Sequence, residues 1–96
     1  MESILFLQRD YSATIVDNIP FYPDPSPIIQ VVAVDADEGA NAELHFTIVE
    51  GNERKKFFID PQSGVVYPNT SFIGLTGEQF TLTVQVNKNN KKQAIA

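Results

Sequence analysis

The sequence consists largely of short runs in which apolar and polar residues alternate, with turn-forming residues between the runs. The most regular run is FTLTVQV at residues 80–86, and LHFTI at residues 44–48 repeats the pattern. Successive side chains of a β-strand point to opposite faces of a sheet, so each run predicts a strand with one buried face. Helical periodicity is hard to find anywhere in the chain. The sequence therefore predicts an all-β protein.

Further elements are predicted around these two strands. A run rich in β-forming residues at 11–16 predicts a first strand, interrupted after Leu7 and ended by turn residues at 17–20. Residues 21–27 contain three prolines, and because proline lacks a backbone donor this segment predicts an extended loop. A second strand follows at residues 28–34. The segment 57–67 predicts a hairpin with its tight turn at 61–64.

Length and composition limit the classes of function. The 96 residues, 43% of them hydrophobic, fit a single folded domain that we place at residues 1–96. The formal net charge of -5 would repel nucleic acids and anionic membrane surfaces, so cations are the more natural partners. Cysteine is absent, which excludes a disulfide framework and a cysteine-ligated metal. The apolar stretch 4–7 is far too short to span a membrane, and we expect any anchoring segment to lie outside this chain.

Five motifs occur in a fixed order and cover almost the whole chain. They are Tyr11 with IVDNIP at 15–20, VVAVD at 31–35, DADEGANAEL at 35–44, FFID at 57–60 with SGVV at 63–66, and FTLTVQV at 80–86. This ordered set resembles a cadherin repeat, and its wording is especially similar to protocadherins and long atypical cadherins. No single motif would suffice for this resemblance.

The resemblance implies both a fold and a function. The implied fold is an antiparallel Greek-key β-sandwich, immunoglobulin-like, and we expect its last strand to be truncated in this chain. The implied function is an extracellular repeat, in the ectodomain of a multi-repeat cell-surface protein that serves calcium-dependent cell–cell adhesion or mechanical linkage. Its partners would be adjacent cadherin repeats and a cadherin or other cell-surface protein, bound homophilically or heterophilically. A membrane would be reached only through segments outside this chain.

The resemblance also implies Ca²⁺ at the junctions between repeats. Calcium takes about six to eight oxygen ligands, which clustered carboxylates and carbonyls supply. In the D-x-D-x-G-x-N motif the implied ligands are Asp35, Asp37 and a carbonyl of Asn41, at the junction with a preceding repeat. Without the resemblance, Asp35 and Asp37 are more readily interpreted as turn formers at a strand end than as ligands.

The other calcium positions depart from the family pattern. Asp17 stands where the opening motif has Glu, and LTGE at 75–78 keeps only the first and last residues of the family's LDRE, so Asp17 and Glu78 are the weaker candidate ligands. Lys88 stands at the position of a further Asp ligand, where a cation opposes calcium. The sequence therefore predicts a degenerate calcium apparatus with incomplete sites.

Two other hypotheses stay open beside adhesion. Asn69-Thr70-Ser71 is an N-x-S/T sequon in a predicted loop, which makes Asn69 a candidate glycosylation site. The alternative function is a calcium-independent β-sandwich that binds a protein partner, with the pair Phe21 and Tyr22 as the first place to look. An enzyme is not expected, because Asp35 and Asp37 have no evident nucleophile or oxyanion donor beside them.

Overall fold

A computed structural model describes residues 4–6, 10–35 and 43–88 of the chain. These residues form strands and loops and contain no helix, which confirms the all-β prediction. The strands are β1 (Ile4–Phe6), β2 (Ile29–Gln30), β3 (Ala33–Asp35), β4 (Leu44–Glu50), β5 (Phe57–Ile59), β6 (Val65–Pro68) and β7 (Thr83–Lys88). The predicted truncated last strand falls on residues outside the described part of the chain.

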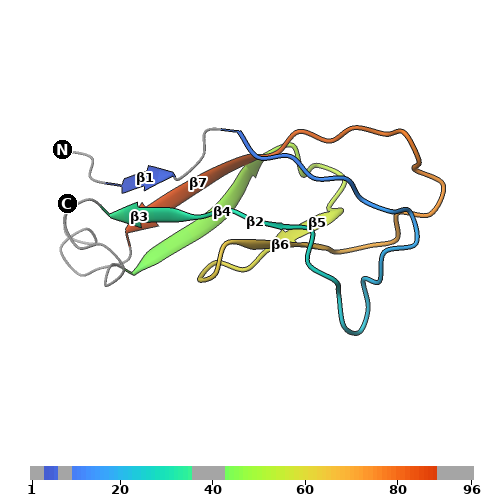
Figure 1. The fold of residues 1–96 in the computed structure, drawn as a ribbon, viewed down its shortest axis with the longest axis horizontal. Helices are drawn as coiled ribbons and strands as arrows, with labels where there is room; N and C mark the ends of the chain where they lie inside the picture. The colour runs from blue at the N-terminus through green and yellow to red at the C-terminus, as the bar shows by residue number, and fades with distance from the viewer. Residues whose placement is uncertain (1–3, 7–9, 36–42, 89–96) are drawn as a thin grey trace.

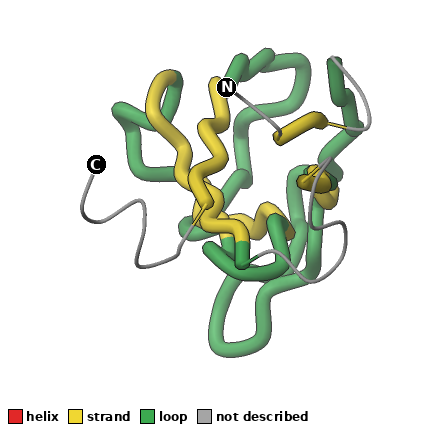
Figure 2. The backbone as a smooth tube through the Cα atoms, turned by 90° about the vertical axis from the view of Figure 1, so that its left-hand side faces the viewer, coloured by secondary structure: helices red, strands yellow, loops and turns green. Residues whose placement is uncertain are grey.

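All pairings between these strands are antiparallel. β1 pairs with β3, β4 pairs with β7, and β6 lies between β2 and β5. Figure 1 shows β3, β4 and β7 running along the long axis of the molecule, whose principal extents are 45 × 25 × 22 Å. Seen along that axis in Figure 2, the strands are surrounded by long loop segments. The antiparallel sheets fit the predicted β-sandwich.

The predicted second strand at 28–34 is split into β2 and β3, which belong to different sheets. Val31 still donates its backbone N–H to the carbonyl of Gly64 at 2.9 Å, beside β6. Val32 is then held by a side chain: the Tyr11 hydroxyl donates to its carbonyl at 3.1 Å and accepts from its N–H at 3.2 Å. The chain therefore changes sheets at residues 31–32.

The predicted first strand is only partly correct. Its early part, before Leu7, is present as β1, but residues 11–16 form no strand. Instead of a backbone ladder, this segment is held by the Tyr11 hydroxyl and by the packing of Ile15 against the core. β-Forming residues can thus satisfy a packing requirement without pairing as a strand.

The predicted hairpin is confirmed as β5 and β6, with Phe58 opposite Tyr67. Asp60 shapes its turn, because one carboxylate oxygen accepts from the N–H groups of Gln62 at 2.8 Å and Ser63 at 3.0 Å. These backbone hydrogen bonds, that from Ser63 first, lower the pKa of Asp60 below its ordinary value. Gly64 has a φ of 77°, and a Cβ there would lie 2.3 Å from the Val31 carbonyl oxygen. Glycine is therefore required at this turn.

The core lies between the sheets and is rich in aromatic rings. Phe57 packs edge to face against Phe72 and Phe80, with ring centroids 5.4 and 5.3 Å apart. Among the described residues, the buried hydrophobic core consists of Val31, Phe46, Phe57, Ile59, Val66 and Phe72. The alternation predicted for residues 80–86 holds, because Phe80 and Leu82 pack against this core although β7 itself begins only at Thr83.

Candidate functional site

Asp35 is the last residue of β3 and lies opposite Ile4 of β1. Its side chain is completely buried, and the residue as a whole is 1% exposed. Aspartate is among the residues least often found fully buried, because removing a carboxylate from water is costly unless it is paired. The burial of Asp35 therefore requires a compensating charge.

Lys88 supplies that charge. Its ammonium nitrogen lies 2.9 Å from Oδ2 of Asp35, and the lysine side chain is 16% exposed. Lys88 is the last residue of β7 and pairs with Leu44, so it belongs to a different sheet from Asp35. In Figure 1 the ends of β3 and β7 meet at the same end of the molecule, beside β1. The ion pair thus links two sheets at that end.

The ammonium of Lys88 competes with a calcium ion for Asp35. Calcium needs several oxygen ligands at about 2.3–2.6 Å, and here an ammonium already lies against one oxygen of the carboxylate. Across the described ranges of the chain, no three Asp, Glu, His or Cys side chains gather into a metal-binding group. Asp37 and Asn41, the other predicted ligands, lie outside the described residues. The positive charge expected from Lys88 is therefore present where calcium was predicted.

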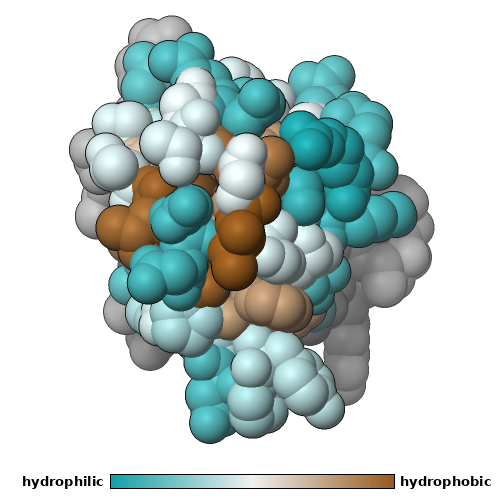
Figure 3. Space-filling model, turned by 90° about the vertical axis from the view of Figure 1, so that its right-hand side faces the viewer, coloured by the Kyte–Doolittle hydropathy of each residue, from teal (hydrophilic) through white to brown (hydrophobic). Residues whose placement is uncertain are grey.

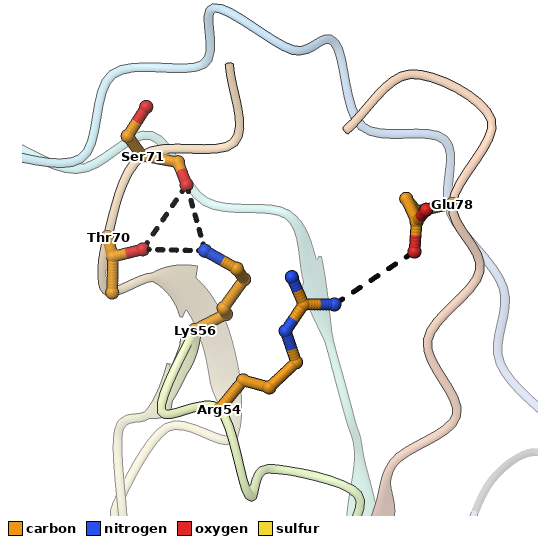
Figure 4. Close-up of polar contacts among 5 residues, drawn as sticks. All are labelled: Arg54, Lys56, Thr70, Ser71 and Glu78. Atoms are coloured by element: carbon orange, nitrogen blue, oxygen red, sulfur yellow. Dashed lines mark hydrogen bonds and ion pairs between the residues drawn. The ribbon is translucent and has the colours of Figure 1, made fainter. Parts of the chain in front are cut away.

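The weaker candidates, Asp17 and Glu78, lie in the loop segments 10–28 and 69–82, which extend to the end of the molecule opposite β1 (Figure 1). Asp17 is exposed and accepts a long hydrogen bond of 3.5 Å from the Thr76 hydroxyl. Glu78 is exposed and lies 3.9 Å from the guanidinium of Arg54, as Figure 4 shows. Such an exposed ion pair contributes only about 0–1 kcal/mol. Neither carboxylate is held in a rigid, buried position.

Two basic residues near β5, Arg54 and Lys56, have specific contacts. The guanidinium of Arg54 lies 5.5 Å from the ring centroid of Phe80, in addition to its contact with Glu78. Lys56 donates to the Thr70 hydroxyl at 3.1 Å and to the Ser71 carbonyl at 3.2 Å (Figure 4). A run of basic residues gives no indication of such contacts, because their partners lie far away in the sequence.

The candidate glycosylation residue Asn69 is exposed and follows the end of β6. Its side-chain amide donates to the carbonyl of Lys55 at 3.2 Å, and its backbone N–H donates to the carbonyl of Lys56 at 2.7 Å. The side chain is therefore at the surface, and its amide nitrogen makes one hydrogen bond to the chain.

A groove of about 940 Å³ runs between the segments 10–17 and 77–84. Its floor includes the core residues Phe57, Val66 and Phe72, whereas Asp10, Asp17 and Glu78 contribute acidic groups to its lining. Figure 3 shows hydrophobic side chains gathered on the face of the molecule at this end. The groove thus combines an apolar lining with three acidic side chains.

Comparison with known proteins identifies relatives of the chain. The cadherin domain family matches residues 11–95. Cadherin-87A of Drosophila melanogaster is 38% identical over 80 residues, covering 83% of this chain and 4% of that protein. Protocadherin Fat 1 of Homo sapiens is 40% identical over 67 residues, or 70% of this chain and 1% of that protein. Cadherin-23 of Homo sapiens is 34% identical over 92 residues, or 96% of this chain and 3% of that protein. The chain thus spans only a few per cent of these relatives' length.

Proposed function

This chain belongs to the cadherin domain family, and on that premise we propose that it acts as one extracellular repeat of a multi-repeat cell-surface protein. The repeat spans residues 1–96 and serves cell–cell adhesion or mechanical linkage, without catalysis. The observation that carries the proposal is the family match over residues 11–95 on an antiparallel β-fold. Its immediate partners are adjacent repeats, and beyond them a cadherin or other cell-surface protein, bound homophilically or heterophilically. Among the described residues no helix is long and apolar enough to cross a membrane.

The test compares ectodomains that contain this repeat in a cell-aggregation assay and in single-molecule stretching. Phe57→Ala removes a core ring that is 5% exposed, and Phe58→Ala removes the neighbouring ring that is 50% exposed. An intact repeat is needed for a linkage that bears force, so the Phe57 variant should extend at lower force and aggregate cells less well. The Phe58 variant is the control. Equal force resistance of the two variants would contradict the proposal.

Calcium enters this function through the predicted ligands Asp35, Asp37 and Asn41 at the junction with a preceding repeat. We propose that their calcium affinity is low, because Lys88 neutralises Asp35. An ion that binds the ordered arrangement of two repeats shifts the population toward a straight rod, so low affinity leaves this junction flexible. At the junction with a following repeat, the candidate ligands are Asp17 and Glu78. Both carboxylates are exposed, so we propose that their calcium affinity is low as well. Tight binding of several calcium ions per junction, measured on the chain joined to its neighbours, would refute this.

A second candidate function is calcium-independent binding of a protein partner. It is favoured by the exposure of Tyr22, at 82%, and of Phe21, at 38%, beside the proline-rich segment. Aromatic side chains are frequent anchors of protein interfaces. Partner binding that persists in a calcium chelator and is lost on Tyr22→Ala would support this candidate, and loss of binding in the chelator would exclude it.

A further inference from the structure

The buried ion pair of Asp35 and Lys88 lies where the family pattern places a calcium ligand. We propose that the Lys88 ammonium is a built-in counter-cation of Asp35, which takes the structural role of calcium at this end of the domain. β3 and β7 are then held together at their ends without calcium. This inference rests on the proposed function in one respect, since it treats Asp35 as a ligand position of a cadherin repeat.

The positions of the two residues support this role. Asp35 ends β3 and Lys88 ends β7, and the two strands belong to different sheets. The 2.9 Å contact therefore holds two sheets together at the point where both strands end. A bound cation stabilises a protein in the same way, by bringing together carboxylates from separate segments. Here the cation is part of the chain, so its occupancy does not depend on the ion concentration in solution.

Burial strengthens the attraction within the pair. The Asp35 side chain is fully buried and Lys88 is 16% exposed, so water screens their attraction only weakly. A calcium ion at the same oxygen would lie next to the ammonium and be repelled by it. Removing one partner of a buried pair leaves an uncompensated charge, which is strongly destabilising. The lysine thus both stabilises the carboxylate and excludes the metal.

The variant Lys88→Met tests the proposal, because it keeps much of the side-chain volume and removes the charge. Without calcium, we expect its melting temperature to fall by about 10 °C or more. In calcium chloride at about ten times the dissociation constant, we expect it to recover by about 5 °C or more. The unaltered chain should change by less than about 1 °C under the same conditions, and magnesium should substitute poorly because it demands a stricter octahedral geometry.

Three controls separate the charge pair from general effects of the substitution. Lys56→Met makes the same change at a half-buried lysine that donates hydrogen bonds to a hydroxyl and a carbonyl, and it should not create a calcium response. Lys88→Arg keeps the cation and should stay insensitive to calcium. The double variant Asp35→Asn with Lys88→Met removes both charges, so it should be more stable than Lys88→Met alone and should not respond to calcium.

The measurements are thermal unfolding by circular dichroism and calcium titration by calorimetry, on the 96-residue chain. A calcium-induced stabilisation of the unaltered chain equal to that of Lys88→Met would overturn the proposal. So would a Lys88→Met variant that is destabilised but gains nothing from calcium, or a double variant no more stable than Lys88→Met. Because the single variant could fail to fold, the double variant and Lys88→Arg keep the outcome decisive. No adhesion is measured, so this result and that of the aggregation assay are independent.

Discussion

Adjacent phenylalanines in β5 allow the burial pattern of the domain to be tested with one kind of substitution. Phe57 is 5% exposed and lies among the rings of Phe72 and Phe80, with which it makes edge-to-face contacts. Phe58 follows it directly, points to the other face and is 50% exposed. We predict that Phe57→Ala and Phe58→Ala differ greatly in their effect on the free energy of unfolding.

The expected magnitudes follow from these environments. Replacing a fully buried Phe by Ala costs about 3–5 kcal/mol, and Phe57 also loses two aromatic contacts. A domain has a total stability of about 5–15 kcal/mol, so Phe57→Ala removes a large part of it. Phe58 retains contact with water, and its ring centroid lies 6.3 Å from that of Tyr67 on the neighbouring strand. A cross-strand pair contributes about 0.2–1 kcal/mol, so Phe58→Ala should cost about 1 kcal/mol.

Urea denaturation followed by far-ultraviolet circular dichroism measures both values, since the chain contains no tryptophan for fluorescence. The midpoint of Phe57→Ala should shift to much lower urea, with the slope of the transition unchanged if two-state behaviour is retained. Phe58→Ala should stay close to the unaltered chain. Equal losses for the two variants, or a loss of less than about 1 kcal/mol for Phe57→Ala, would refute the assignment of Phe57 to the core.

Three further predictions concern single polar groups. Tyr11→Phe removes the hydroxyl that hydrogen-bonds to both the N–H and the carbonyl of Val32. It should lower the free energy of unfolding, measured by urea titration, by about 1–3 kcal/mol. An unchanged free energy of unfolding would mean that water replaces the hydroxyl. Because the pKa of Asp60 is lowered, its ionised form stabilises the fold above the ordinary value of 3.8, and this contribution is lost as the pH falls through the lower folded-state value. Asp60→Asn should therefore be less stable than the unaltered chain at pH 7 and converge with it in acid; a difference that persists in acid contradicts this. Asn69 should carry an N-glycan on secretion, seen as a mass increase that Asn69→Gln abolishes, and an unmodified secreted chain would show that the sequon is not used.

Much of the local structure was predictable from the sequence because a strand has a fixed period of two. The alternation at residues 44–48 and 80–86 identified the buried faces of both segments, and the Pro, Ser and Gly residues at 61–64 identified the hairpin turn. The order of the motifs identified the family, since it spans almost the whole chain. The strand and turn patterns depend on neighbouring residues only, whereas the family match depends on the order of motifs along the chain.

The pairing of segments distant in the sequence was decided by the tertiary structure. Residues 11–16 have the composition of a strand, but the Tyr11 hydroxyl and core packing hold them without a ladder. The segment 28–34 is rich in β-forming residues, yet it divides between two sheets. Its middle residues, Val31 and Val32, are hydrogen-bonded to Gly64 and Tyr11. Propensity describes which residues suit a sheet and does not specify their partners.

The candidate site shows the same division. Comparison of the sequence with a family pattern predicted Asp35 as a calcium ligand and Lys88 as a cation at a ligand position. Only the tertiary structure brought the ammonium within 2.9 Å of a fully buried carboxylate, by ending β3 and β7 at the same end of the molecule. Burial and distance depend on how the sheets pack, and they determine whether a lysine merely weakens a calcium site or replaces the ion.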